Sequence, residues 1–413
     1  MQIGILGGGA AGFFAAITAS ETDPQARVTI LEASASPLSK VRISGGGRCN
    51  VTHHCDDPTQ LVTHYPRGAQ ELLGPFTRFG PRETSAWFHS RGVTLKTEAD
   101  GRMFPTTDDS KTVVEALLKT AAGSGVTLLT GARVEAVECT FSDGRSRKFR
   151  LLGRGVPDRP FDRLLVATGN GSRGYRIAES VGHTIVPCMP SLFTFKVEDE
   201  RIAGLAGVSF ADVELTLQCG RGKELQQRGP LLITHWGLSG PAVLALSAWG
   251  ARVLHAAGYR ARLTVNFLPG QPAGGFRESL QAVKTQRGSA RVQNEPQSGL
   301  PRRYWGRACA RAGAGAETAW AHLTHRALDA LVAELTAAEF AISGKGVFKE
   351  EFVTSGGVDL KEVDFRTMES KRSPNLYFAG EVLDIDGVTG GFNFQSAWTC
   401  GYIAGIHMAR RAE

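Results

Sequence analysis

The sequence predicts an α/β protein whose main domain is a Rossmann-like sheet, and three motifs predict it. At the amino terminus the apolar run QIGIL leads into the glycine-rich turn GGGAAG and the start of a helix. The apolar run DRLLV ends in Ala-Thr-Gly near the middle of the chain, and NLYFA ends in Gly-Glu near its close. Glycine-rich turns at the carboxyl ends of apolar strands are typical of nucleotide-binding α/β sheets.

The first of these motifs has the spacing of a dinucleotide-binding turn. Its first glycine permits the tight turn, the second lets a pyrophosphate approach the backbone, and the third lets the helix pack on the strand. A second apolar strand, RVTILE, ends in an acid about 20 residues further on, where a carboxylate bonds a ribose hydroxyl and disfavours a 2′-phosphate. FAD or NAD is therefore favoured over NADP. The residues expected to contact the dinucleotide here are Gly7, Gly9, Ala10, Ala11, Gly12 and Glu32.

The two later motifs decide between FAD and NAD. An amino-terminal glycine turn, a mid-chain Ala-Thr-Gly and a carboxyl-terminal Gly-Glu are typical of flavoproteins with two dinucleotide folds. A plain NAD dehydrogenase has no need of the last element, so the sequence predicts bound FAD. The cofactor contacts expected from these motifs are Ala167, Thr168, Gly169, Gly380 and Glu381.

Composition limits the setting in which the protein works. The 413 residues predict two or three domains, and a formal charge of +7 permits an anionic partner such as RNA. The seven cysteines are scattered without a Cys-x-x-Cys pair, so we expect reduced thiols in a cytoplasmic protein and no metal site. No apolar run of about 18 residues occurs, so we expect no membrane span.

Four segments carry a resemblance to a known family. They are SGGGRCNVT at 44–52, THWGLSGPAVL at 234–244, TSGGVD at 354–359 and GEVLDIDGVTGGFNFQSAW at 380–398. Over nearly the whole chain the sequence resembles the BaiN-like (YhiN-like) bacterial FAD-dependent flavoproteins. The resemblance implies three parts: a discontinuous FAD-binding domain at 1–188 and 346–413, an inserted β-barrel-like domain at 189–272 and 337–345, and a small helical subdomain at 273–336.

The resemblance also implies an activity. Family members are FAD-dependent oxidoreductases that would take electrons from NADH or NADPH, a transient donor, and reduce an activated C=C bond. One line reduces bile-acid-like enones, and another makes dihydrouridine in large-subunit ribosomal RNA. Uridine in that RNA is the leading expected substrate. A small-molecule enone, and a non-catalytic flavin-bearing RNA- or ribosome-binding factor, stay open as alternatives.

The chain departs from the family pattern in two places. The loop after Gly169 is shorter than usual, which bears on the substrate side of the flavin. Ser39-Lys40 stands where Gly-Arg-Lys is usual, so that only Lys40 and Arg42 supply positive charge before the SGGGRCN loop.

The SGGGRCN loop contains the two sharpest hypotheses. Its glycines would let it lie flat against a flavin, where a Cβ would clash. Arg48 could stabilise the reduced, anionic flavin or hold a substrate, or it could form a salt bridge in a purely structural loop. Cys49 could act as general acid, or it could be a small buried residue. His235 is a further candidate proton donor or substrate contact. The cofactor contacts expected around this loop are Lys40, Ser44, Gly45, Gly46, Gly47, Arg48, Cys49 and Asn50.

The closing segment is expected to meet the flavin ring. Its glycine loop begins a helix whose amino end can face the pyrimidine part of the flavin. Asn393 and Gln395 could hydrogen-bond that ring, whereas Phe392 and Trp398 are more typical of a core. By the resemblance, Val134 contacts the adenine. The remaining cofactor contacts expected are Val134, Gly390, Gly391, Phe392 and Asn393.

A basic run between residues 277 and 311 is the candidate nucleic-acid surface. Eight basic residues stand there against two acids, with Tyr304 and Trp305 among them. Basic groups neutralise phosphates and aromatic rings stack on unpaired bases; the alternative is a solvated helical face. Residues 271–300, which are polar and rich in Gly, Gln and Ser, are predicted to form a linker or loop. The expected nucleic-acid contacts are Arg302, Arg303, Arg307 and Arg311.

Overall fold

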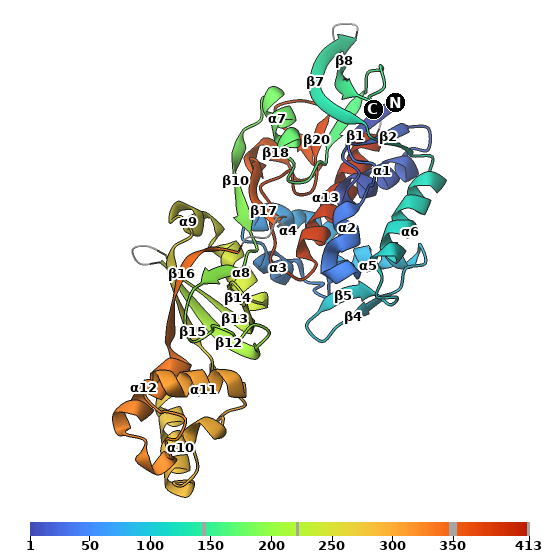
Figure 1. Ribbon diagram of the computed structural model, residues 1–413. Helices are drawn as coiled ribbons and strands as arrows, with labels where there is room; N and C mark the ends of the chain where they lie inside the picture. The colour runs from blue at the N-terminus through green and yellow to red at the C-terminus, as the bar shows by residue number, and fades with distance from the viewer. Residues whose placement is uncertain (143–145, 220–222, 347–352, 411–413) are drawn as a thin grey trace. The chain divides into compact units, whose positions relative to one another are not determined.

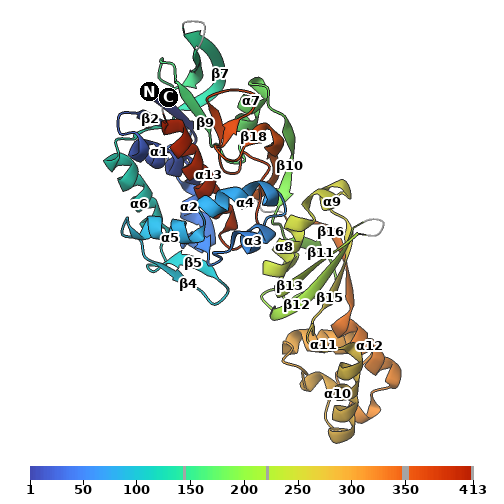
Figure 2. The same cartoon turned by 180° about the vertical axis from the view of Figure 1, so that it is seen from behind.

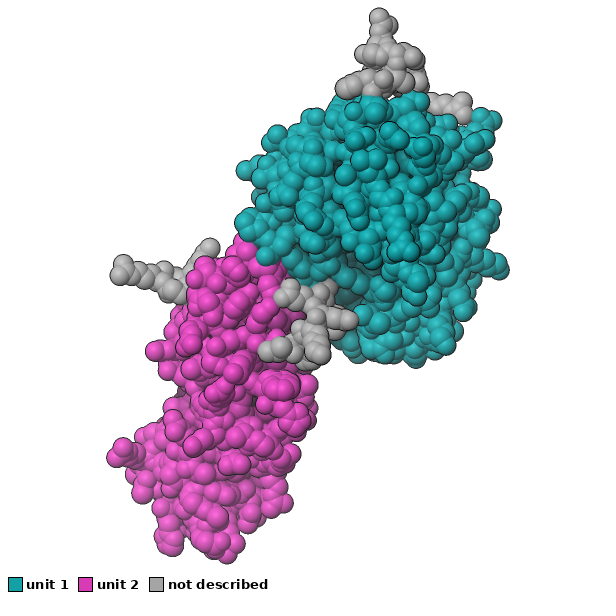
Figure 3. Space-filling model, turned by 45° about the horizontal axis from the view of Figure 1, so that its top comes forward, with its two compact units in different colours: residues 1–188, 353–413 teal, residues 189–352 magenta. Residues whose placement is uncertain are grey.

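The structure is a computed structural model that describes residues 1–142, 146–219, 223–346 and 353–410 (Figure 1). The chain divides into two compact units: unit 1 comprises residues 1–188 and 353–413, and unit 2 comprises residues 189–352 (Figure 3). The expected return to the first domain begins at 346, and residues 347–352 of that stretch lie outside the described part. The separation of the inserted part into a β-rich and a helical domain stays a prediction.

Unit 1 is built on a seven-stranded sheet. In spatial order its strands are β18 (Val363–Asp364), β19 (Glu369–Ser370), β20 (Leu376–Phe378), β9 (Arg163–Val166), β1 (Gln2–Leu6), β2 (Arg27–Glu32) and β6 (Thr127–Thr130). The strands from β20 to β6 pair in parallel. The apolar side chains of β20, β9, β1 and β2 are buried, as parallel strands covered on both faces require, whereas those of the edge strand β6 are only partly buried. Because β1, β9 and β20 are adjacent and parallel, their three glycine-containing turns emerge at the same edge of the sheet.

Two helices from opposite ends of the chain pack together in unit 1. Helices α1 (Ala10–Thr22) and α13 (Phe392–Ala409) lie side by side in both views (Figures 1 and 2). The ring of Phe14 in α1 lies 5.1 Å from that of Trp398 in α13, and both side chains are fully buried. Trp398 is therefore a core residue, as predicted from the sequence. The two ends of the sequence thus complete one domain core.

Unit 1 adds short helices and small sheets around these elements. Its further helices are α2 (Ser39–Ile43), α3 (Pro58–Leu61), α4 (Ala69–Arg78), α5 (Pro81–His89), α6 (Ser110–Gly123) and α7 (Ser172–Ser180). Its small sheets are β3 (Thr52–His53) with β5 (Arg102–Pro105) and β4 (Leu95–Thr97), and β7 (Arg133–Ser142) with β8 (Ser146–Arg154). A further pair joins β17 (Val353–Val358) to β10 (Ile185–Ser191), whose last three residues belong to unit 2. The first of these sheets bears on the site, because β3 directly follows the SGGGRCN loop.

Unit 2 contains a closed barrel of six strands. Around the barrel the strands are β11 (Phe195–Val197), β14 (Gly237–Ser239), β13 (Lys223–Thr234), β12 (Ser209–Cys219), β15 (Ala261–Asn266) and β16 (Ala338–Lys345). Helices α8 (Pro241–Trp249) and α9 (Ala251–Ala256) stand between β14 and β15 in the chain. Val213, Leu215 and Leu217 alternate along β12 and are fully buried, as a strand with one face toward a core requires.

Three helices lie between β15 and β16 in the chain: α10 (Ala273–Gln286), α11 (Arg302–Arg311) and α12 (His325–Thr336). The prediction of a linker or loop over 271–300 is wrong for its first half, which α10 occupies. Phe276 and Leu280 stand four residues apart and are fully buried, so a polar composition concealed an amphipathic helix. The predicted α/β class, with a barrel-like insertion and helices, is confirmed. None of the helices in the described ranges is both long and apolar enough to cross a membrane.

Candidate functional site

The glycine-rich turn after β1 has no room for a side chain at its first and last glycines, but it has open space at its middle one. Gly7 has φ +108°, and a Cβ there would lie 2.4 Å from the carbonyl oxygen of Ala167. A Cβ on Gly12 would lie 2.0 Å from the Gly7 oxygen, so α1 packs on the turn only without a side chain at that position. By contrast, no atom lies within 4 Å of a Cβ built on Gly9. A phosphate group fits at this opening, at the amino end of α1.

Glu32 lies beside the turn, at the end of β2. Its carboxylate accepts hydrogen bonds of 2.7 Å from the backbone N–H groups of Gly8 and Ser34. Its backbone oxygen accepts from the Ala132 N–H at 2.9 Å, which brings the start of β7 close by. Val134, two residues further on, is buried. The contacts of Glu32 with ribose and of Val134 with adenine stay predictions.

A polar cluster joins motifs from four parts of unit 1. Lys40 Nζ lies 2.5 Å from a Glu381 carboxylate oxygen and donates to Asn170 Oδ1 at 2.9 Å. Asn170 Nδ2 donates in turn to Thr354 Oγ1 at 2.9 Å. Asn170 and Thr354 are not among the cofactor contacts predicted from the sequence. Their position was the available signal, because Asn170 follows Ala-Thr-Gly directly and Thr354 opens the TSGGVD segment.

The SGGGRCN loop needs its glycines for the path of the backbone. Gly45, Gly46 and Gly47 have φ values of +58°, +69° and +86°, in the left-handed region that a Cβ disfavours. No atom lies within 4 Å of a Cβ built on Gly46 or Gly47, so the loop leaves open space there. Ser44 Oγ donates to Val41 O at 3.0 Å and anchors the start of the loop.

The SGGGRCN loop and the closing glycine loop are in direct contact. Asn50 is buried, and in the amide orientation that satisfies its neighbours its Oδ1 accepts from the Gly391 N–H at 3.0 Å. Its Nδ2 then donates to Thr52 O at 3.0 Å. Both ends of the Asn50 amide are already hydrogen-bonded to backbone groups of the protein, so the predicted flavin contact through this side chain is not supported. Asn50 instead fixes the backbone that precedes α13.

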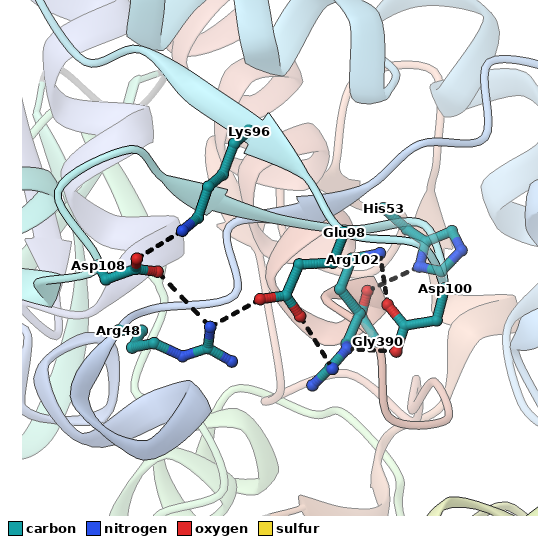
Figure 4. Close-up of polar contacts among 8 residues, drawn as sticks. All are labelled: Arg48, His53, Lys96, Glu98, Asp100, Arg102, Asp108 and Gly390. Atoms are coloured by element: carbon teal, nitrogen blue, oxygen red, sulfur yellow. Dashed lines mark hydrogen bonds and ion pairs between the residues drawn. The ribbon is translucent and has the colours of Figure 1, made fainter. Parts of the chain in front are cut away.

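Arg48 lies in a chain of alternating charges (Figure 4). Its guanidinium is 2.7 Å from Glu98 and 3.5 Å from Asp108, and it stacks on Phe104 at 3.9 Å from the ring centre. The hydrogen bond to Glu98 raises the pKa of the guanidinium. Three further charged residues continue the chain through ion pairs, and they are Lys96, Asp100 and Arg102.

These contacts correct the interpretation of Arg48 as a free cation beside the flavin. The three cations of the chain are matched by three carboxylates, so little net positive potential reaches a neighbouring group. Glu98 stands 50 positions from Arg48 in the sequence, which is why the SGGGRCN motif alone did not reveal the pairing. The salt-bridged alternative is the arrangement that the structure contains.

Cys49 points into the protein. Its side chain has no exposed surface, and burial raises the pKa of the thiol to about 12. A thiol so placed does not reach a substrate, and it is a weak acid. The role of general acid is therefore not supported, and the alternative of a small buried residue describes it.

We expect the thiol of Cys49 to resist alkylation in the native protein. With a pKa of about 12, about one thiol in ten thousand is ionised at pH 8, and the ionised fraction rises tenfold per pH unit up to that pKa. Iodoacetamide should label the exposed Cys188 first and Cys49 only on unfolding, as peptide mass spectrometry can measure. Equal labelling of the two thiols at pH 8 would contradict the burial of Cys49.

The side-chain amides in the first turn of α13 are also hydrogen-bonded within the protein. Asn393 donates from Nδ2 to Gly387 O at 2.9 Å and accepts at Oδ1 from Gly387 N at 2.8 Å. Gln395 is fully buried and accepts from Thr52 Oγ1 at 2.5 Å. Side-chain hydrogen bonds from these two amides to a flavin are therefore not supported. What the helix end keeps available is its backbone, because the first N–H groups of a helix have no intrahelical acceptor.

His235 lies in unit 2, exposed in the turn between β13 and β14. Its neighbour Trp236 is also exposed, and the turn is held by a 3.2 Å hydrogen bond from Thr234 Oγ1 to Gly237 O. His235 thus belongs to a different unit from the residues described above. Its role as proton donor or substrate contact stays a prediction.

The basic run forms the exposed face of α11 and its surroundings. Tyr304 and Trp305 are fully buried, and Trp305 Nε1 donates to Val292 O at 2.8 Å. The expectation that these aromatic rings stack on bases is therefore wrong, because they belong to the core of unit 2. Four arginines of α11 are exposed and form no ion pair among the described residues: Arg302, Arg303, Arg307 and Arg311.

The fold and this edge of the sheet together define a class. Open space at Gly9 and at Gly46, with Glu32 beside the first turn, fits an extended dinucleotide that carries a flavin. No cluster of three His, Cys, Asp or Glu residues that could hold a metal ion is found in the part of the chain that the structure describes. These features describe a flavoprotein of the two-dinucleotide class. The family model for the HI0933-like protein Rossmann domain matches residues 1–407, and the chain belongs to this family.

Several curated relatives match nearly the whole chain, and two of them show the range of their activities. The 3-dehydro-bile acid delta(4,6)-reductase of Clostridium scindens is 31% identical, over 99% of this chain and 99% of the relative. The ribosomal RNA dihydrouridine synthase of Escherichia coli is 30% identical, over 96% of this chain and 94% of the relative. These matches confirm the resemblance to the BaiN-like family.

A solved structure supports the fold. The 3-ketosteroid delta1-dehydrogenase from Sterolibacterium denitrificans matches with a TM-score of 0.50 at 12% identity, over 98% of this chain and 99% of that chain. At this identity the likeness concerns the fold alone. The family and the curated relatives show that the chain is an FAD-dependent oxidoreductase, which leaves the non-catalytic alternative without support.

Proposed function

We propose that this protein uses NADH or NADPH to reduce an activated C=C bond, with uridine in large-subunit ribosomal RNA as the leading substrate. The names of the two relatives described above indicate saturation of a C=C bond, in a steroid-like molecule for one and in a uracil ring for the other. In each case a carbonyl conjugated to the double bond would make it accept hydride. That shared chemistry supports the reaction class, and the substrate is a further step.

The residues of unit 1 would divide the work of holding FAD. The opening at Gly9 would take the pyrophosphate and Glu32 a ribose hydroxyl, while the open side of Gly46 and Gly47 would accept the flavin ring. Bound FAD would supply the hydride chemistry. The backbone N–H groups at the start of α13 would stabilise negative charge on the pyrimidine part of the ring. Among the proton donors considered, His235 is the one whose side chain is exposed.

The exposed arginines of α11 are the observation that carries RNA as the substrate. Arg303 and Arg307 donate to the backbone oxygens of Gly204 and Ala203, which holds their guanidinium groups in place without neutralising them. Exposed, unneutralised cations on one helix face suit the phosphates of a nucleic acid. The basic residues before α11 suit it less, because ion pairs engage three of them: Arg277, Arg287 and Arg291.

The experiment is mass spectrometry of dihydrouridine in large-subunit ribosomal RNA, from cells with and without this gene. We expect deletion to remove dihydrouridine and the wild-type gene to restore it. Arg303→Glu should restore less dihydrouridine, because it replaces a cation that would bind a phosphate by an anion that repels it. In a binding assay, the same change should reduce the magnitude of the slope of log affinity against log salt by about 1. Arg291→Glu is the matched control, since Glu317 already neutralises Arg291. An unchanged dihydrouridine level on deletion would exclude this substrate.

A small-molecule enone is the second candidate, favoured by the 31% identity to the Clostridium scindens reductase along its full length. It predicts that a steroid 4,6-dien-3-one speeds NADH or NADPH oxidation by the purified protein, while deletion leaves dihydrouridine unchanged. Under this alternative, the exposed face of α11 is a solvated surface. If RNA fragments speed NADH or NADPH oxidation and enones do not, the small-molecule alternative is wrong.

A further inference from the structure

The loop before α13 is held in place by residues 52–67, far away in the sequence. His53 Nδ1 lies 3.0 Å from Gly390 O, as Figure 4 shows. Tyr65 OH donates to Phe392 O at 2.7 Å, and Val388 N donates to His64 O at 2.9 Å. The backbone is thus fastened on both sides of the point where α13 begins.

Three rings pack together at this point. The ring of Phe392 lies 4.6 Å from that of His53, at 28°, and 4.2 Å from that of His64, at 12°. Both histidines are therefore stacked on the first residue of α13. Only the His53 side chain adds a polar contact, because no described residue is hydrogen-bonded to the imidazole nitrogens of His64, whose contact with Val388 is through the backbone. The two histidines form a natural pair for comparison.

The contact to Gly390 determines the tautomer of His53. A carbonyl oxygen only accepts, so the Nδ1 atom of His53 must carry the hydrogen and donate it. On the other side of the ring, a Cβ built on Gly101 would lie 2.5 Å from Nε2, so only glycine fits against that nitrogen. Burial lowers the pKa of His53, which keeps the ring neutral at pH 7. His53 thus fixes geometry and contributes no charge.

We propose that His53 is a positioning residue for the flavin: by holding Gly390 O, it aims the N–H groups of Phe392 and Asn393 at the pyrimidine part of the ring. The proposal rests on the assignment of FAD in the proposed function. It follows from the neutralisation of Arg48, because the amino end of α13 then remains as the positive end of a dipole at this site. Both the affinity for FAD and the stability of the reduced flavin should therefore depend on His53.

The test compares His53→Phe with His64→Phe. Each variant keeps an aromatic ring against Phe392, but only His53→Phe removes the hydrogen bond to Gly390 O. We expect the FAD dissociation constant of His53→Phe to rise about tenfold, the equivalent of about 1.4 kcal/mol for one hydrogen bond. Its flavin midpoint potential should become more negative, because a misaligned helix end stabilises the reduced anion less. His64→Phe should stay within about twofold of the wild type in affinity, with an unchanged potential.

A second pair of variants and a folding measurement keep the test decisive. Melting temperatures of the apo-proteins show whether each variant folds. If His53→Phe does not fold, His53→Gln and His53→Met replace it, because glutamine keeps an N–H donor and methionine does not. Glutamine should then bind FAD more tightly than methionine. Equal affinities and potentials in that pair would overturn the proposal.

The outcomes separate this proposal from the proposed function. Equal affinities and potentials in wild type, His53→Phe and His64→Phe would overturn the role of His53 and leave FAD binding established. Equal losses in the two phenylalanine variants would overturn it as well, because ring packing and not the hydrogen bond would then matter. A wild type without FAD would overturn both assignments. Failure to reduce either candidate substrate would count against the proposed function only.

Discussion

Replacing Gly9 by aspartate is expected to abolish FAD binding while the apo-protein stays folded. Gly9 caps α1 with an extended backbone, at φ −95° and ψ −169°, and has empty space around a built Cβ, so a side chain fits without strain. Aspartate is a favoured helix cap, which should stabilise α1 over glycine by about a few tenths of a kcal/mol. The same carboxylate would stand where the pyrophosphate is expected. At about 4 Å and an effective dielectric constant of about 20, two like charges repel by about 4 kcal/mol, or about a thousandfold in affinity.

The measurement is flavin binding to the apo-protein by calorimetry, together with the melting temperature of that apo-protein. Gly9→Asn is the matched control, because asparagine has the same size and capping ability without the charge. We expect Gly9→Asn to lose much less affinity than Gly9→Asp. Wild-type FAD affinity in Gly9→Asp would place the pyrophosphate away from this turn. An unfolded Gly9→Asp apo-protein would mean that the fold itself requires glycine at this position.

The second large effect is expected at the buried pair of Arg67 and Asp386. Two hydrogen bonds join the guanidinium to the carboxylate, whose side chain is 0% exposed. Arg67→Met would leave that carboxylate buried without its cation, which costs about 3–5 kcal/mol of unfolding free energy. Asp386 belongs to the loop that leads into α13, so FAD affinity should fall as well. Urea unfolding of the apo-protein measures the first effect, and flavin titration the second.

Two controls show whether burial is the cause. Arg228 and Asp212 form a similar two-pronged pair on the surface, with side chains 57% and 46% exposed, so Arg228→Met should cost less than about 1 kcal/mol. The double variant Arg67→Met with Asp386→Leu removes both charges and should recover much of the lost stability. If Arg67→Met lowers the free energy of unfolding no more than Arg228→Met does, other groups must compensate the buried carboxylate, and the prediction is wrong.

The glycine turn shows what could be predicted from the sequence. The conformations of Gly7 and Gly12 depend on neighbours within one strand–turn–helix unit, so their spacing carried the information. The same holds for Glu32, which reaches the turn from the next strand and binds the Gly8 N–H. The three glycine turns also meet as expected, because parallel neighbouring strands end at one edge.

The chemistry of the side chains at the site could not be predicted in this way. Arg48 and Cys49 stand next to each other in one motif, yet one is ion-paired on a partly exposed surface and the other has no exposed surface. Neither Tyr304 nor Trp305 reaches the surface, although the basic residues around them do. Charge pairing and burial are set by whatever packs against a residue from elsewhere in the chain.

The class of fold, the place of the dinucleotide turn and the backbone conformation of the glycines could all be predicted from the sequence. Which polar side chains already have partners within the protein became visible only in the folded chain. Asn50 is bound to Gly391, and His53 reaches Gly390 across 337 positions of sequence. The physical reason is range: a glycine's φ is a local property, whereas a hydrogen-bond partner or a desolvated thiol depends on contacts that exist only once the two ends of the chain have packed together.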